Sequence, residues 1–167
     1  MQSDLFMYAL RTVKDSIRKN IKCGFEVVEE FEDSKNQIKV SVTDLYQAAN
    51  DKNGQRIAVA DSLFEAPARY EMCFSVLFNG RKMEDVLSAL GEVAVYFKDN
   101  NSFDCGDYNW HGNDLKKFFI EPVIRKDAVK GNDKLHLDYK IELQLNSVKE
   151  EHFRRVEKKI LNTNQIV

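Results

Sequence analysis

The sequence predicts an α+β domain whose mostly antiparallel sheet of about four to five strands is packed by an N-terminal helix and a middle helix. Two segments repeat apolar residues every three or four positions, and residues 135–145 alternate strictly between apolar and polar. The 167 residues include 11 Phe and 6 Tyr but only 7 Gly and 2 Pro, which favours one densely packed core. We expect residues 1–148 to form this domain and residues 149–167 to form a C-terminal amphipathic helix or tail.

The first helix is predicted from its apolar spacing. Its core-facing residues are Phe6, Leu10, Val13, Ile17 and Ile21. Ser3 or Asp4 is expected to cap its start, and Gly24 is expected to provide a left-handed cap at its end. Residues 25–31 and 38–42 then predict two strands joined by the polar stretch EDSKN.

The middle of the chain combines a long polar segment with a buried strand and a helix. Residues 45–61 carry an Asn-Gly turn signal and predict a long exposed loop or a projecting hairpin. Residues 70–78 predict a central strand covered on both sides. The next helix is expected to pack on the sheet through Met83, Val86, Leu87, Leu90, Val93, Ala94 and Phe97.

The last third begins with a polar loop, residues 98–114, that holds three aromatic side chains. Residues 118–129 follow as an edge strand or bulge interrupted by Pro122. The alternating strand 135–145 presents a polar outer face to solvent or to a partner. A helix with a charged back face is predicted over residues 148–160.

The charge balance argues against two classes of partner. The chain has 25 Lys and Arg against 27 Asp and Glu, a formal net charge of -2, so the overall field does not attract nucleic acid. No stretch approaches the roughly 18 apolar residues of a membrane span. We therefore expect no nucleic acid, no membrane and a cytoplasmic location, with the three cysteines reduced.

Catalytic and metal chemistry find weak support in the residue pattern. A metal reading of the polar loop would use Asp104, Cys105, Asp107 and His111, but their spacing matches no zinc pattern of paired ligands. Cys105 with His111 is the best nucleophile and base pair, yet it lies in no local catalytic signature. We expect no enzyme activity, no metal and no cofactor.

The features that favour a function are aromatic and arginine side chains placed for protein contacts, since such residues dominate interface energies. The interface candidates are Arg69, Tyr70, Phe103, Tyr108, Trp110, Arg154 and Arg155. The alternative for Trp110 is that it caps the core of its own domain.

The order of landmarks is similar to that of a known family. The chain contains VSVTDLYQA, then APARYEMCFSVLF, then the helix EDVLSALGEVAVYFKDN, and finally the strand LHLDYKIELQL. Over residues 1–148 this resembles the tail-terminator-like domain of cap proteins from contractile injection systems and phage tails. Leu45-Tyr46 and Leu90-Gly91 occupy its leucine-tyrosine and leucine-glycine positions. The segment NDKNGQRIAVAD departs from the family's arginine-asparagine element, and the loop around YNWHG has no counterpart.

The resemblance implies a structural protein that forms a ring, a hexamer, on the last layer of tube and sheath and ends their polymerisation. Its partners would be other copies of itself and the tube and sheath proteins of the same particle. We expect the ring to use the first helix and the sheet edge, with residues 47–62 or 98–114 reaching tube or sheath. The alternative is a non-enzymatic adaptor, chaperone or neutralising module that binds through its aromatic loops.

Overall fold

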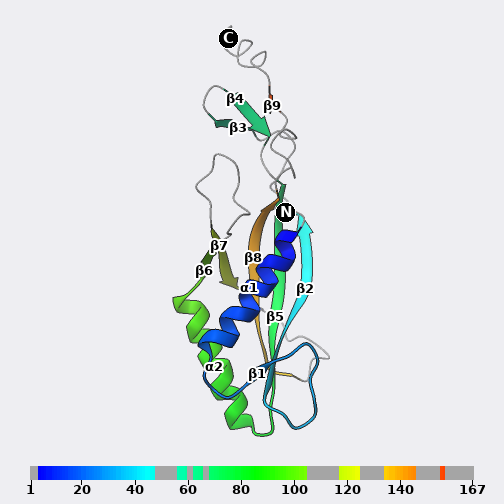
Figure 1. Cartoon of the computed structure of the whole chain (residues 1–167), viewed down its shortest axis with the longest axis vertical. Coiled ribbons are helices and arrows are strands. Elements are labelled where there is room, and N and C mark those ends of the chain that lie inside the picture. Colours follow the sequence, from blue (N-terminus) through cyan, green and yellow to red (C-terminus); the bar gives the residue numbers. More distant parts are fainter. Residues whose placement is uncertain are drawn as a thin grey trace.

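The computed structural model describes residues 4–47, 56–59, 62–65, 68–104, 117–124, 134–145 and 155–156. Within these ranges the chain forms two helices and nine strands (Figure 1). The main sheet has six strands in the order β1-β2-β5-β8-β7-β6. The α+β class is therefore confirmed, but the sheet is larger than the four to five strands predicted.

Two of the three predicted helices are present, α1 at Leu5–Asn20 and α2 at Met83–Asp99. The predicted caps of α1 are wrong in detail. Asp4 occupies the N-cap position without a capping hydrogen bond from its side chain, and the helix ends at Asn20. Gly24, with φ of 80°, instead allows the turn that leads into β1.

Six strands build the main sheet: β1 (Glu26–Val27), β2 (Gln37–Gln47), β5 (Ala68–Asn79), β6 (Ser102–Asp104), β7 (Lys117–Pro122) and β8 (His136–Leu145). The two strands predicted over residues 25–31 and 38–42 are present as β1 and β2, but β1 is shorter than predicted and pairs with β2 in parallel. The remaining pairs of this sheet are antiparallel. The sheet is thus mostly antiparallel, as predicted.

Strand β5 lies at the centre, with β2 on one side and β8 on the other. Its even-numbered side chains from Met72 to Phe78 are buried beneath the helices, whereas Cys73 and Leu77 on the opposite face are only half-buried. Figure 1 shows α1 and α2 on the same face of the sheet. The predicted cover on both faces is found only in part: on the second face Ser75 is buried, but no helix in the described part of the chain packs there.

The hydrophobic core lies between the two helices and this one face. Its helix residues include Ala9, Val13, Ala89 and Val93, all fully buried. Met83 and Leu87 were predicted to join them but are 62% and 53% exposed. The apolar arc of α2 is wider than the surface that the sheet covers, so part of the helix stays in solvent.

A second sheet has the order β3-β4-β9, with β3 at Arg56–Val59, β4 at Ser62–Glu65 and β9 at Arg155–Val156. The antiparallel pair β3 and β4 agrees with the projecting hairpin considered for residues 45–61. The predicted C-terminal helix is not confirmed. The two described residues of that stretch pair with Leu63 and Phe64 as a strand, and the rest of residues 149–167 lies outside the described ranges.

Strand β7 is not an edge strand, because β6 pairs with its outer side. Pro122 is its last residue, which fits a residue that lacks a backbone donor. Just beyond it, the Val123 N–H donates to the Asp138 carbonyl over 2.9 Å. Neither helix in the described ranges is long and apolar enough to cross a membrane.

Candidate interaction surfaces

The first candidate surface is the face of the main sheet opposite the helices, here called the outer face. Because side chains alternate along strands, polar residues of β8 share this face with polar residues of β5 and β7. Arg69 Nε and Glu142 Oε1 lie 2.8 Å apart, and Lys140 Nζ lies 3.8 Å from Glu121 Oε2. These pairs connect β5, β7 and β8, so the outer face carries charges of both signs across three strands.

One end of the outer face carries a tyrosine and a carboxylate. The pairing of β2 with β5 shifts between Val42 and Asp44, and this irregularity places Asp44 and Tyr46 opposite Cys73 and Glu71. The Tyr46 hydroxyl donates to the Glu71 carboxylate. This hydrogen bond to a negative group raises the pKa of Tyr46 to about 12. The hydroxyl therefore keeps its proton at neutral pH.

The free thiol beside this pair is poorly suited to nucleophilic chemistry. Burial raises the pKa of Cys73, and the charges of Asp44 and Glu71 raise it further. A raised pKa lowers the fraction of reactive thiolate at neutral pH. Cys23 behaves in the same way, because burial and the carboxylate of Glu92 raise its pKa.

Near the other end, three polar side chains meet on β5 and β8. The Ser75 hydroxyl donates to one oxygen of the Asp138 carboxylate, and His136 Nε2 lies 3.3 Å from the other oxygen. A catalytic serine would instead give its proton to the histidine. Here both groups contact the aspartate, an arrangement that ties the two strands together.

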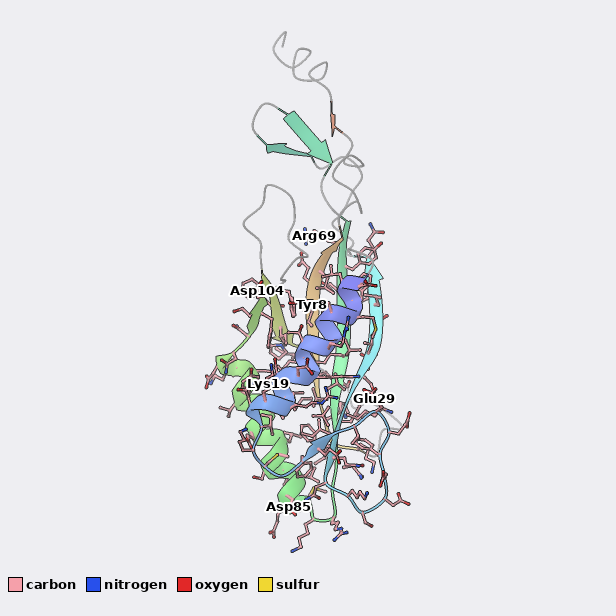
Figure 2. All side chains as sticks on the ribbon, in the orientation of Figure 1. Tyr8, Lys19, Glu29, Arg69, Asp85 and Asp104 are labelled. Carbon is pink, nitrogen blue, oxygen red and sulfur yellow. The ribbon has the colours of Figure 1, made fainter. Side chains whose placement is uncertain are left out.

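Two of the predicted interface residues sit next to each other on opposite faces of β5. Arg69 lies on the outer face in its pair with Glu142. Tyr70 lies on the helix side, where its ring contacts Phe6 edge-on at 5.5 Å between centroids. Figure 2 shows Arg69 at one end of the main sheet and Asp85 of α2 at the other. Only Arg69 of this pair belongs to the outer face.

Phe103 is packed within its own chain. Its ring stacks on Phe118 at 5.6 Å between centroids and meets Phe97 at 6.4 Å. The neighbouring Asp104 carbonyl accepts a hydrogen bond of 3.0 Å from the Tyr8 hydroxyl, which ties β6 to α1. These contacts connect the edge of the sheet to both helices.

The remaining interface candidates fall where little is described. Tyr108, Trp110 and Arg154 lie outside the described residues, and for Arg155 the structure gives only the backbone, in β9. Three of the candidate metal ligands, Cys105, Asp107 and His111, also lie outside the described residues. Their predicted roles stay predictions.

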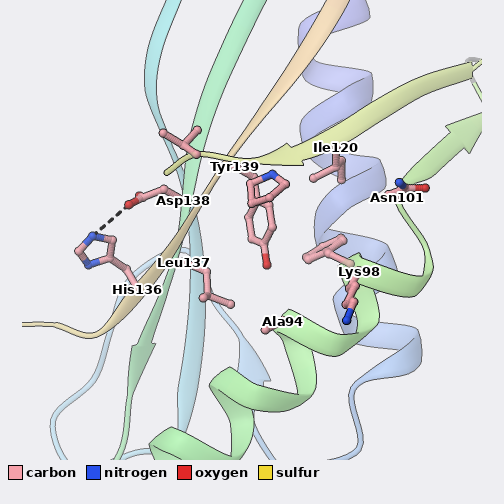
Figure 3. A pocket seen from close by; sticks show the side chains of 11 residues that line it. Ala94, Lys98, Asn101, Ile120, His136, Leu137, Asp138 and Tyr139 are labelled. Atoms are coloured by element: carbon pink, nitrogen blue, oxygen red, sulfur yellow. Dashed lines mark ion pairs between the residues drawn. The ribbon is translucent and has the colours of Figure 1, made fainter. Parts of the chain in front are cut away.

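The second candidate surface is a pocket of about 580 Å³ between the end of α2 and strands β7 and β8 (Figure 3). Apolar side chains make most of its wall. They include Ala94, Phe97, Ile120, Pro122, Val123 and Leu137. Tyr139 is 6% exposed, and Figure 3 shows its hydroxyl directed into the space between β8 and α2. Burial raises the pKa of this phenol to about 12.

Sequence reasoning missed both the tyrosine pair and the pocket. The alternation of β8 did indicate a polar outer face, including His136, Asp138, Lys140 and Glu142. Tyr46 was assigned to a loop because the irregularity in β2 interrupts its period of two. The pocket is lined by residues that are distant in the sequence, and a local sequence pattern cannot predict that they lie close together.

Comparison with known proteins finds one type of relationship. No protein-family model and no curated protein matches the chain. Among solved structures, the chain is similar to the sheath/tube terminator of an extracellular contractile injection system, PVC, in its extended state. The TM-score is 0.53 and the sequence identity is 10%, over 81% of this chain and 55% of the terminator.

This similarity concerns the fold. An identity of 10% carries no information on individual side chains, and the chain spans about half the length of the terminator that it matches. The fold of this protein is thus one that a tail component uses.

Proposed function

We propose that this protein is a structural component of a contractile injection system or phage-tail-like particle, and that it forms the ring that ends tube and sheath polymerisation. The observation that carries the proposal is the fold shared with a sheath/tube terminator over 81% of the chain. The order of sequence landmarks supports it independently. A structural role is also consistent with the raised pKa values of Cys23 and Cys73, which disfavour thiol chemistry.

A terminator has to offer the growing polymer one complementary face and withhold the face on which another layer would add. A closed ring of small domains does this, because its subunits use up their lateral contacts on each other. In this protein the helices cover one face of the sheet, while the outer face is polar and charged. In the proposal, a hexameric ring directs one such surface toward tube and sheath.

The experiment is co-assembly with the tube and sheath proteins of the same particle, followed by electron microscopy of tube lengths. The proposal expects tubes to become shorter and more uniform as the ratio of this protein to tube protein rises. A matched control is the same titration with heat-unfolded protein. Lengths that do not respond to the folded protein at any ratio would contradict the proposal.

The alternative function is a non-enzymatic adaptor, chaperone or neutralising module. The observation that favours it is the apolar pocket beside α2, which suits a segment of another protein. Such a module would bind one partner with fixed stoichiometry as a monomer of 19.4 kDa. Light scattering separates the two, since the ring would have about six times that mass.

A further inference from the structure

The two helices carry opposite net charge. Helix α1 has four basic residues and one acidic residue, whereas α2 has four acidic residues and one basic residue. The net charge is therefore +3 for α1 and -3 for α2. Opposite net charges on two helices of one subunit favour contact between α1 of one copy and α2 of another.

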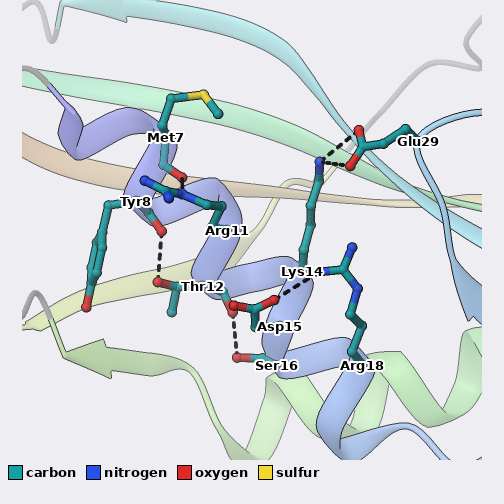
Figure 4. A network of polar contacts seen from close by, with 9 residues as sticks. All are labelled: Met7, Tyr8, Arg11, Thr12, Lys14, Asp15, Ser16, Arg18 and Glu29. Carbon is teal, nitrogen blue, oxygen red and sulfur yellow. Dashed lines mark hydrogen bonds and ion pairs between the residues drawn. The ribbon is translucent and has the colours of Figure 1, made fainter.

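The side formed by α1 and β2, here called the α1 side, combines basic and apolar groups. Lys14 binds Glu29 beside β1, which identifies the flank of α1 that faces this side. Figure 4 shows Met7 on the same flank and Tyr8 on the other. Met7 is 55% exposed, and Arg11 next to it is also exposed. This flank thus presents an exposed apolar group at Met7 and an exposed basic group at Arg11, while Lys14 is paired with Glu29.

Strand β2 continues the α1 side. Beyond Ile38, no described strand pairs with the outer edge of β2, since β1 reaches only Gln37 and Ile38. On the helix-facing surface of this edge, Val42 and Leu45 are each 43% exposed. Both lie opposite buried core residues of β5, so their side chains extend the core sideways to the molecular surface.

The side formed by α2 and the pocket, here called the α2 side, combines the acidic helix with exposed apolar groups, although Lys98 of this helix lines the pocket. Met83, Leu87, Gly91 and Val95 recur every four residues, and Leu87 and Val95 are 53% and 59% exposed. A side chain added at Gly91 would meet nothing within 4 Å. This leaves room for close approach of another chain along the helix.

The pocket extends the apolar surface of α2 toward the sheet. Ala94 lines it about one helical turn beyond Gly91 and about two turns beyond Leu87. Within the described residues, the Tyr139 hydroxyl makes no hydrogen bond, although this side chain is almost fully buried. A buried hydroxyl favours an occupant or a water molecule that supplies a partner. The pocket therefore suits apolar side chains with a polar backbone nearby.

The strand register places the α1 and α2 sides at the same level of the sheet. Val42 pairs with Phe74, Phe74 pairs with Tyr139, and Tyr139 pairs with Pro122. This single row begins at an exposed residue of the α1 side and ends in the wall of the pocket. Identical subunits that repeat around an axis need their two contact surfaces at matching heights, and this row provides them.

From these features we infer that neighbouring copies of this chain join head to tail, with Val42 and Leu45 of one copy packed on Leu87 and Val95 and into the pocket of the next. The inference rests on the proposed ring and names its lateral contact. The occupant of the pocket is a second copy, because the same chain carries the apolar edge, a helix of opposite net charge and the matching height. In an open chain of such contacts, the α1 side of one end subunit and the α2 side of the other stay unpaired. They pair with each other when the ring closes.

The test uses two double variants with substitutions at exposed positions. The α1-side variant carries Val42→Asp and Leu45→Asp, and the α2-side variant carries Leu87→Asp and Val95→Asp. Aspartate on both sides makes the two altered surfaces repel each other. Phe119→Asp is the matched control, since Phe119 is 50% exposed but belongs to the outer face of β7. Circular dichroism verifies that each variant is folded.

Light scattering is expected to show a ring for the wild type and for Phe119→Asp, and a monomer of 19.4 kDa for each double variant alone. A mixture of the two double variants retains one intact contact, between the normal α2 side of one and the normal α1 side of the other. The mixture should therefore form a heterodimer of twice the monomer mass and nothing larger.

Three results would overturn the inference. If the wild type forms a ring and either double variant also does, the contact is elsewhere and the proposed function still stands. If the mixture returns to a full ring or stays monomeric, the head-to-tail contact is wrong. If the wild type stays monomeric at high concentration and with tube protein present, the proposed ring fails and the inference fails with it.

Discussion

Two glycines show how differently the same residue type is constrained in this fold. At Gly80, an added Cβ would lie 2.7 Å from Val86 Cγ2 and 3.0 Å from Asn36 Oδ1. Val86 is buried and β-branched, so it has little freedom to move. At Gly91, in the exposed part of α2, an added Cβ meets nothing within 4 Å.

Gly80→Ala is therefore expected to lower the free energy of unfolding by about 1–3 kcal/mol, the usual cost of overpacking. Gly91→Ala is its matched control and should raise it by about 0.5–1 kcal/mol, because alanine is the better helix former. Urea denaturation of both variants measures the two changes. Equal effects of the two substitutions would contradict the close contact at Gly80.

Tyr139 predicts a pH dependence of stability. Burial raises its pKa from 10.0 to about 12, so the folded protein holds this proton more tightly than the unfolded chain does. The resulting stabilisation is complete below pH 10 and is lost as the pH rises toward 12. Tyr139→Phe should make the free energy of unfolding less dependent on pH between 10 and 12, measured by urea denaturation. An unchanged slope would show that Tyr139 does not ionise on unfolding.

At the scale of elements, β6 is held to the core by an aromatic contact. Phe103 stacks on Phe118 and meets Phe97 of α2. Phe103→Ala should cost about 2–4 kcal/mol of stability, because it leaves a space between half-buried and buried rings. Phe119→Ala, on the exposed side of β7, should change stability by less than about 0.5 kcal/mol. Thermal and urea unfolding measure both.

The same Phe103 variant also tests the sequence-based prediction that this residue contacts a partner. If its role is packing, the oligomeric mass measured below the unfolding temperature stays that of the wild type. If Phe103→Ala dissociates a stable oligomer without lowering the unfolding temperature, the residue belongs to an interface.

The elements that the sequence predicts well are those fixed by local periodicity. Helix α1, helix α2 and the strands β5 and β8 follow from apolar spacing alone. The parallel pairing of β1 with β2 does not, since strand partners are chosen by the whole sheet. The exposure of Met83 and Leu87 was missed for a related reason. Periodicity shows which side of a helix is apolar, but not how much of that side the sheet covers.

The candidate surfaces were predictable only in part. The polar residues of β8 follow from strict alternation, so their shared face was expected. Tyr46 lies on this face because the strand register shifts in β2, and the residue pattern does not predict that shift. The pocket depends on where β7 ends relative to α2, which is a property of the tertiary structure.

At the scale of the whole molecule, the arrangement separates three kinds of surface. The outer face of the sheet carries ion pairs, the α1 side joins a basic helix to exposed apolar residues, and the α2 side joins an acidic helix to exposed apolar residues. Two complementary lateral sides and a distinct third face are what a ring subunit needs in order to contact its neighbours and a stacked layer at once. The fold shared with a sheath/tube terminator provides the context for this arrangement.

The position of the protein on assembled tubes tests the central claim most directly. Gold-labelled protein is mixed with the tube and sheath proteins of its own particle, and electron microscopy records where the label lies. The account predicts label at tube ends, confined to one end of each tube, and no further growth from labelled ends. Label spread along the shaft, or labelled ends that keep growing, would contradict it.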